Sequence, residues 1–66
     1  MKIQLTYKNK TEYVADILPT GILWTSLSDE AMKFKNRQYA KWRMFQINDE
    51  LQNTINSEYQ LKVVAN

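Results

Sequence analysis

The chain has 66 residues, a formal net charge of +2 at pH 7, no cysteine and no histidine. It therefore has neither disulfides nor the two commonest zinc ligands, and a hydrophobic core must stabilise it. Hydrophobic residues make up 44% of the chain, while one glycine and one proline are too few for a disordered or linker-like sequence. We expect one ordered domain over residues 1–66.

The first 25 residues predict a β-hairpin followed by a short third strand, within residues 2–25. Residues 2–8 and 12–18 alternate polar and apolar side chains, the period of a half-buried strand, and the turn is expected at residues 9–11. Pro19 and Gly21 fit a type I turn that leads into the apolar segment 22–25. The expected core-facing side chains are Ile3, Leu5 and Tyr7 from the first strand and Tyr13, Ala15 and Ile17 from the second, with Val14 on the opposite face.

A long helix is predicted over residues 27–55. Ser26 or Ser28 can cap it, and Asp29 and Glu30 then fall in the first turn, where the helix dipole favours acidic side chains. Asp29 also stands four residues before Lys33, a spacing that supports a continuous helix.

The end of the chain predicts one more strand over residues 58–65. Asn56 and Ser57 are weak helix-end signals, and polar and apolar residues then alternate up to the β-branched pair Val63 and Val64. The rival interpretation is a helix that continues to the end. The predicted class is α+β, a small antiparallel sheet packed on one long amphipathic helix.

The predicted helix carries two apolar stripes, although one helix on one sheet needs only one. At about 100° per residue, the first stripe consists of Leu27, Ala31, Phe34, Trp42 and Phe45. The second consists of Ala40, Met44, Ile47, Leu51 and Ile55. Either the helix breaks near residues 36–40 and each piece buries one face, or a continuous helix offers its second stripe to a partner. The second alternative is favoured, with a second copy of the chain as the simplest partner.

The middle of the helix is rich in cations and aromatic side chains. Five cations and three aromatic residues fall within residues 33–43, and cations recur every four residues along one side. The candidate partner-binding residues are Lys33, Arg37, Tyr39, Lys41, Trp42 and Arg43. Four acidic residues in the segment 29–50 reduce its net charge to about +1, which argues against a surface that tracks phosphates.

Catalysis is not expected. General acid–base chemistry most often uses histidine, and nucleophilic catalysis uses cysteine or a serine activated by a base, whereas Ser26 and Ser28 stand at capping positions. A single glycine excludes a glycine-rich phosphate loop. No catalytic residue, metal ligand or cofactor-binding residue is therefore assigned.

Two functional hypotheses remain. The first is a small regulator or inhibitor that docks its helix on a larger host protein, as accessory proteins of phages and mobile elements do. The second is a dimeric nucleic-acid-binding regulator that uses the basic middle of the helix. No apolar run approaches the roughly 18 residues of a membrane span and no signal-peptide segment is present, so we expect a cytoplasmic protein without a membrane partner.

Overall fold

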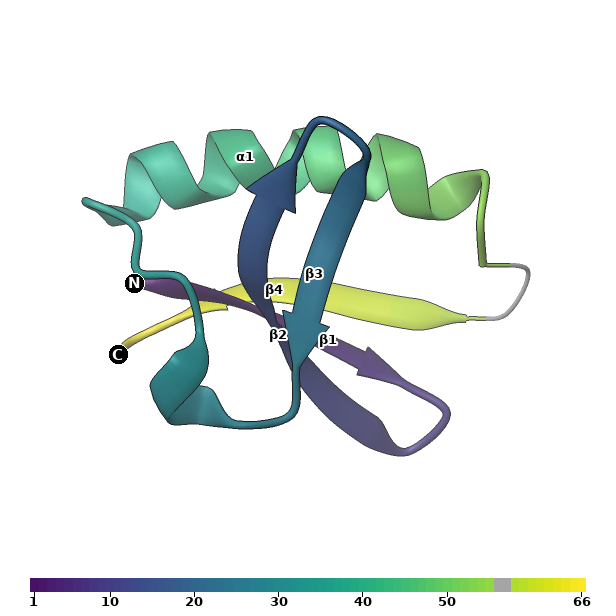
Figure 1. The fold of residues 1–66 in the computed structure, drawn as a ribbon, viewed down its shortest axis with the longest axis horizontal. Helices are drawn as coiled ribbons and strands as arrows, with labels where there is room; N and C mark the ends of the chain where they lie inside the picture. Colours follow the sequence, from purple (N-terminus) through teal and green to yellow (C-terminus); the bar gives the residue numbers. More distant parts are fainter. Residues whose placement is uncertain (56–57) are drawn as a thin grey trace.

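A computed structural model describes residues 1–55 and 58–66 of the chain (Figure 1). Its elements in chain order are β1 (Lys2–Tyr7), β2 (Lys10–Leu18), β3 (Gly21–Thr25), the 3-10 turn η1 (Ser28–Glu30), α1 (Arg37–Gln52) and β4 (Tyr59–Val64). The strands form one antiparallel sheet in the order β3-β2-β1-β4, and α1 packs against it. This confirms the α+β class, and the last segment is a strand rather than a helix.

The hairpin between β1 and β2 closes through a two-residue turn, Lys8–Asn9. Tyr7 pairs with Lys10, and both turn residues have positive φ, 49° and 64°. Two positive φ angles in a two-residue loop define a type I′ turn, whose twist matches that of the flanking strands. The turn lies earlier than the predicted residues 9–11. The tight turn before β3 lies where Pro19 and Gly21 predicted it, since Leu18 pairs with Gly21.

β2 contains a β-bulge between Val14 and Asp16, where its pairing with β3 shifts register. The extra residue reverses the alternation of side chains along the strand. Val14 is therefore fully buried, and Ile17 packs against the same core. The prediction that Val14 lies opposite to Ile17 was wrong for this reason. Figure 1 shows the second half of β2 and β3 running across β1 and β4.

The segment between η1 and α1 is extended, so the predicted continuous helix over 27–55 was wrong. The Met32 amide donates to the Val14 carbonyl at 2.8 Å, and the Phe34 amide donates to the Met1 carbonyl at 2.7 Å. The pairing of β1 with β2 does not extend beyond Gln4 and Tyr13. Past that point this segment binds the backbone of β2 at Val14 and of Met1, the residue just before β1. Phe34 is buried there.

α1 begins after Asn36, whose side-chain Oδ1 accepts a hydrogen bond from the Tyr39 amide at 2.8 Å. It ends at Gln52, and the predicted end signal at Asn56 and Ser57 lies outside the described residues. The helix contacts β4 most extensively and β1 less. The buried core consists of Ile3, Leu5, Val14, Phe34, Ala40, Ile47 and Leu51. Among the described residues, α1 included, there is no helix of the length and apolarity that crossing a membrane requires.

Candidate binding site

The inward face of α1 is formed by the stripe that the sequence analysis assigned to a partner. Ala40, Ile47 and Leu51 are buried, and Met44 and Ile55 pack against them from partly buried positions. The chain's own sheet covers these side chains, because α1 begins after Asn36 and packs with this stripe toward β4 and β1. In this fold Ala40, Ile47 and Leu51 are therefore not available to a second copy or another partner, which corrects the prediction for these three residues.

The outward face of α1 carries three exposed aromatic residues, Tyr39, Trp42 and Phe45, which we call the aromatic patch. Their exposed fractions are 42%, 54% and 64%. At about 100° per residue, Trp42 and Phe45 lie about 140° and 160° around the helix from buried Ile47. Both residues belong to the first stripe, which was expected to be covered by the sheet. Phe45 is therefore a candidate binding residue that the sequence pattern did not indicate.

Ring contacts connect the aromatic patch to the core. The Phe34 and Tyr39 ring centroids are 6.0 Å apart, and so are those of Tyr39 and Trp42. The Arg43 guanidinium carbon lies 6.0 Å from the Trp42 ring centroid, within the range of a cation–π contact. Because Phe34 is buried, it fixes Tyr39 and through it the near end of the patch. Tyr39 and Trp42 are thus connected to the core rather than independent side chains.

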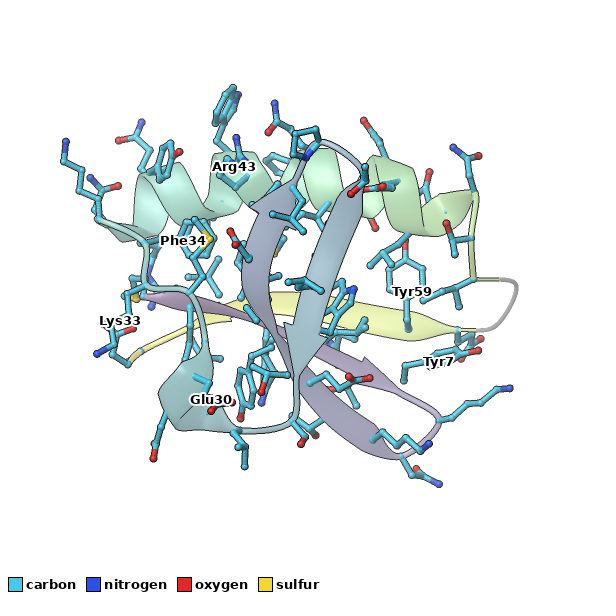
Figure 2. All side chains as sticks on the ribbon, in the orientation of Figure 1. Tyr7, Glu30, Lys33, Phe34, Arg43 and Tyr59 are labelled. Carbon is cyan, nitrogen blue, oxygen red and sulfur yellow. The ribbon has the colours of Figure 1, made fainter. Side chains whose placement is uncertain are left out.

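The predicted cations lie on two different parts of the chain. Lys33 lies on the segment before the helix (Figure 2). Arg37 and Lys41 are exposed residues of α1, so the three do not form one helical row. Of the six candidate residues, the structure brings Tyr39 and Arg43 into contact with Trp42.

Two shallow grooves flank the aromatic patch. The first has a volume of about 360 Å³ and is lined by Asn36, Gln38, Tyr39 and Trp42. The second, which we call the β4 groove, has a volume of about 400 Å³ and is lined by Met44, Phe45, Asn48, Tyr59, Gln60 and Leu61. Phe45 therefore belongs both to the aromatic patch and to the β4 groove.

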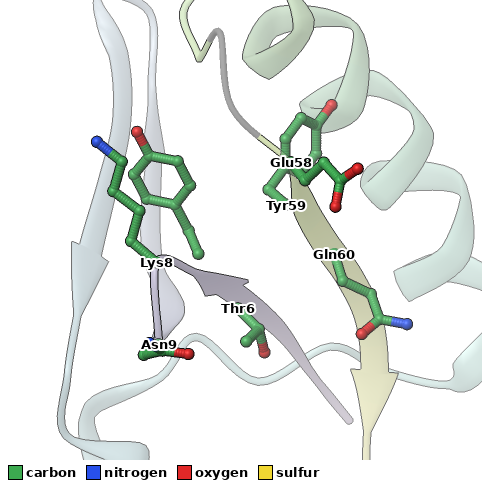
Figure 3. Close-up of a pocket in the computed structure, with 7 residues that line it drawn as sticks. Thr6, Lys8, Asn9, Glu58, Tyr59 and Gln60 are labelled. Carbon is green, nitrogen blue, oxygen red and sulfur yellow. The ribbon is translucent and has the colours of Figure 1, made fainter.

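A larger hollow of about 470 Å³ lies between the type I′ turn and the start of β4 (Figure 3). It is lined by Thr6, Tyr7, Lys8, Asn9, Glu58, Tyr59 and Gln60. The Lys8 ammonium lies 5.3 Å from the Tyr7 ring centroid. One ammonium and one carboxylate are the charged groups of this lining, and no group of three or more acidic residues in the described parts of the chain is placed to hold a metal ion. Its lining offers polar and charged groups for contact with a ligand.

Comparisons with protein-family models, with curated proteins and with solved structures find no match for this chain.

Proposed function

We propose that this chain is a non-catalytic binding protein that regulates or inhibits a larger protein by docking the aromatic patch of α1 on it. The observation that carries the proposal is the exposure of Trp42 and Phe45 on the face of the helix opposite to the core. Adjacent large aromatic side chains on a solvent-exposed surface are typical of interaction sites. Trp, Tyr and Arg are the residues most enriched among those that dominate the free energy of protein association.

The surroundings of the patch support a protein partner. Lys41 and Gln38 stand beside Trp42 on the exposed side of the helix, and Asp49 follows further along it. A protein–protein interface usually has apolar side chains at its centre and polar and charged side chains around them. The composition of the chain resembles that of accessory proteins of phages and mobile elements, and this favours a host protein as the partner.

The proposal is tested by capturing partners from a lysate of the source cells with three immobilised forms of the chain. These are the wild type, Trp42→Ser, and Leu23→Ser as a matched control. Leu23 is an equally exposed apolar residue, at 51%, but lies on β3. We expect a protein that the wild type and Leu23→Ser retain and that Trp42→Ser loses. Equal retention by all three forms, or loss of all retention after nuclease treatment, contradicts the proposal.

A nucleic-acid partner is the second candidate, and the placement of charge favours it to a degree. Five cations lie in residues 33–43, whereas Asp49 and Glu50 stand near the other end of α1, about 9 Å further along the axis from Arg43. The start of the helix is thus more positive than the net charge suggests. Against this candidate, the outward face of the helix presents Trp42 and Phe45, where a helix in a major groove presents polar side chains.

A salt titration separates the two candidates. Under the main proposal, binding to duplex DNA or to RNA is undetectable even at low salt. A steep loss of affinity with rising salt, which becomes shallower in an Arg37→Ala, Arg43→Ala variant, would instead favour nucleic acid.

A further inference from the structure

β4 is an edge strand with one free side. It pairs with β1 along its whole length, from Tyr59 opposite Tyr7 to Val64 opposite Lys2, and it ends the sheet order. Within the described residues no strand pairs with its other side. Such an edge presents a row of backbone N–H and C=O groups to which another extended chain can bind.

The β4 groove lies along this free edge. Its strand wall consists of the consecutive residues Tyr59, Gln60 and Leu61. Because successive side chains of a strand point to opposite faces, a groove that touches all three follows the edge and not one face of the sheet. Its other wall is α1, through Met44, Phe45 and Asn48.

The two walls are fixed to each other by a polar contact. The Tyr59 hydroxyl lies 2.5 Å from Oδ1 of Asn48 and 3.4 Å from the carbonyl oxygen of the same residue. Figure 2 shows the Tyr59 side chain between β4 and α1. Met44 and Leu61 are half-buried, whereas Phe45 is 64% exposed. The groove is therefore preformed, apolar on its helix side, and open at Phe45.

We propose that the β4 groove binds an extended peptide segment of a partner protein, which adds to β4 as a fifth strand. Main-chain hydrogen bonds to the free edge hold the segment, and alternate side chains enter the apolar groove. Apolar residues at alternate positions of the segment contact Phe45, Met44 and Leu61. The residues between them point to the opposite face, where α1 does not cover the sheet.

Charge on that opposite face specifies the segment further. Lys62 is the one charged residue of β4, and it is exposed. Its cross-strand neighbour on β1 is the uncharged Gln4, so no acidic side chain stands opposite it. Opposite charges on neighbouring strands stabilise their pairing. An acidic residue between the two apolar residues of the segment therefore complements Lys62.

A second copy of the chain fits this edge less well than a peptide does. Paired strands lie about 4.8 Å apart, whereas packed helices need about 8–10 Å between their axes. Since α1 packs chiefly against β4, pairing β4 with its copy would bring two α1 helices too close together. A peptide strand brings no helix with it.

The inference goes beyond the proposed function, because it concerns a different surface that shares Phe45 with the aromatic patch. The test is selection of binders to the intact chain from a displayed library of random peptides of about ten residues, a length that spans one strand. Selected peptides are then titrated against the wild type, Phe45→Ser and Trp42→Ser, with amide chemical shifts followed by NMR. Unchanged amide spectra away from the substituted residue verify that each variant folds.

We expect selected peptides with two apolar residues flanking an acidic one, and shift changes concentrated at residues 59–64. Phe45→Ser lowers their affinity at least about tenfold, and Trp42→Ser leaves it within about twofold. Methylating one alternating set of peptide amides abolishes binding, while methylating the other set is tolerated, because one set faces β4.

Four results would overturn the inference. The first is that the wild type enriches no more peptides from the library than Phe45→Ser does, and the second is that binding survives methylation of either set of amides. The third is that the shift changes fall at Tyr39 and Trp42 instead of β4. The fourth is that the free protein sediments as a dimer that Phe45→Ser dissociates. Shift changes at Tyr39 and Trp42 would still support the aromatic patch. Equal retention of lysate proteins by the wild type and Trp42→Ser would contradict the aromatic patch but leave the β4 groove standing. The two proposals therefore fail separately.

Discussion

The two faces of α1 both carry apolar side chains, but they differ in how far these side chains are buried. The inward face presents Ala40, Ile47 and Leu51, with at most 6% exposed, and the outward face presents Trp42 and Phe45 with more than half of each exposed. Apolar side chains therefore lie on both faces, although Gln38 and Asp49 also stand on the outward one. A stripe of apolar residues thus identifies a surface that contacts something, whereas the point where the helix starts and the sheet beneath it decide which stripe becomes core.

Truncating an inward residue is expected to have the largest effect on stability. Leu51→Ala removes a buried side chain and leaves a cavity, so the free energy of unfolding should fall by about 2–5 kcal/mol. A domain of this size has little stability to lose, and the variant is expected to be partly unfolded at room temperature. Denaturant unfolding measures this, with Ile47→Val, at about 0.5–1.5 kcal/mol, as the milder companion. A loss below about 1 kcal/mol for Leu51→Ala would contradict the assignment of this face to the core.

Removing the helix cap should have the next largest effect. In Asn36→Ala the Tyr39 amide loses the acceptor that it contacts at 2.8 Å, and the free energy of unfolding should fall by about 1 kcal/mol. Asn36→Asp keeps an acceptor at the same position and serves as the control. If Asn36→Ala and Asn36→Asp were equally stable, the start of α1 would not depend on this cap. Packing against the sheet would then decide by itself which face of the helix is buried.

The hydrogen bond between Tyr59 on β4 and Asn48 on α1 lies between the two faces of the helix, and its contribution to stability can be measured. Tyr59→Phe removes the hydroxyl that donates to Asn48 and should cost about 0.5–1.5 kcal/mol in unfolding free energy. Combining it with Asn48→Ala should cost less than the sum of the two single changes, because both remove the same hydrogen bond. Strict additivity in this double-mutant cycle would show that the contact is not formed.

Replacing an outward residue should have the smallest effect on stability. Trp42→Ser changes an exposed side chain, and the free energy of unfolding should stay within about 0.5 kcal/mol of the wild type. The same substitution removes the more exposed of the two tryptophans, so quenching of the remaining Trp24 emission by acrylamide should weaken. A loss of stability as large as that of Leu51→Ala would place Trp42 in the core and remove the aromatic patch.

Much of the fold follows from local sequence patterns. Alternation predicts β1, β2 and β4, and the turn before β3 follows from Pro19 and Gly21. The bulge at residues 14–16 is set by pairing with β3, so alternation within β2 alone assigns Val14 to the wrong face. The extended segment before α1 is likewise fixed by contacts with distant residues, since its amides bind carbonyls of Val14 and Met1. No breaker residue marks that segment, and tertiary contacts override its helix propensity.

The candidate site was predicted in part. Tyr39, Trp42 and Arg43 were identified by the combination of aromatic and cationic residues, and the structure groups them. Phe45 was assigned to the core, because the predicted helix began at residue 27 and its first stripe joined Phe45 to Phe34. The sequence signal that could have indicated Phe45 is Asn36, a residue type that favours the N-cap position. A helix that begins after Asn36 excludes Phe34, and Ala40, Ile47 and Leu51 then form its regular inward stripe. The β4 groove depends on which strand ends the sheet, and no local pattern encodes that order.

The pairing of β1 with β4 also governs how the chain reaches its fold. The first strand acquires its second neighbour from residues 59–64, so the sheet is completed by contacts between segments that are nearly a whole chain apart. Contacts of this sequence separation slow folding, because a long loop must close before they form. During synthesis, the N-terminal hairpin has to wait with Ile3 and Leu5 incompletely covered until the last strand emerges. A chain that stops before residue 59 is therefore expected to aggregate rather than to fold as a smaller domain.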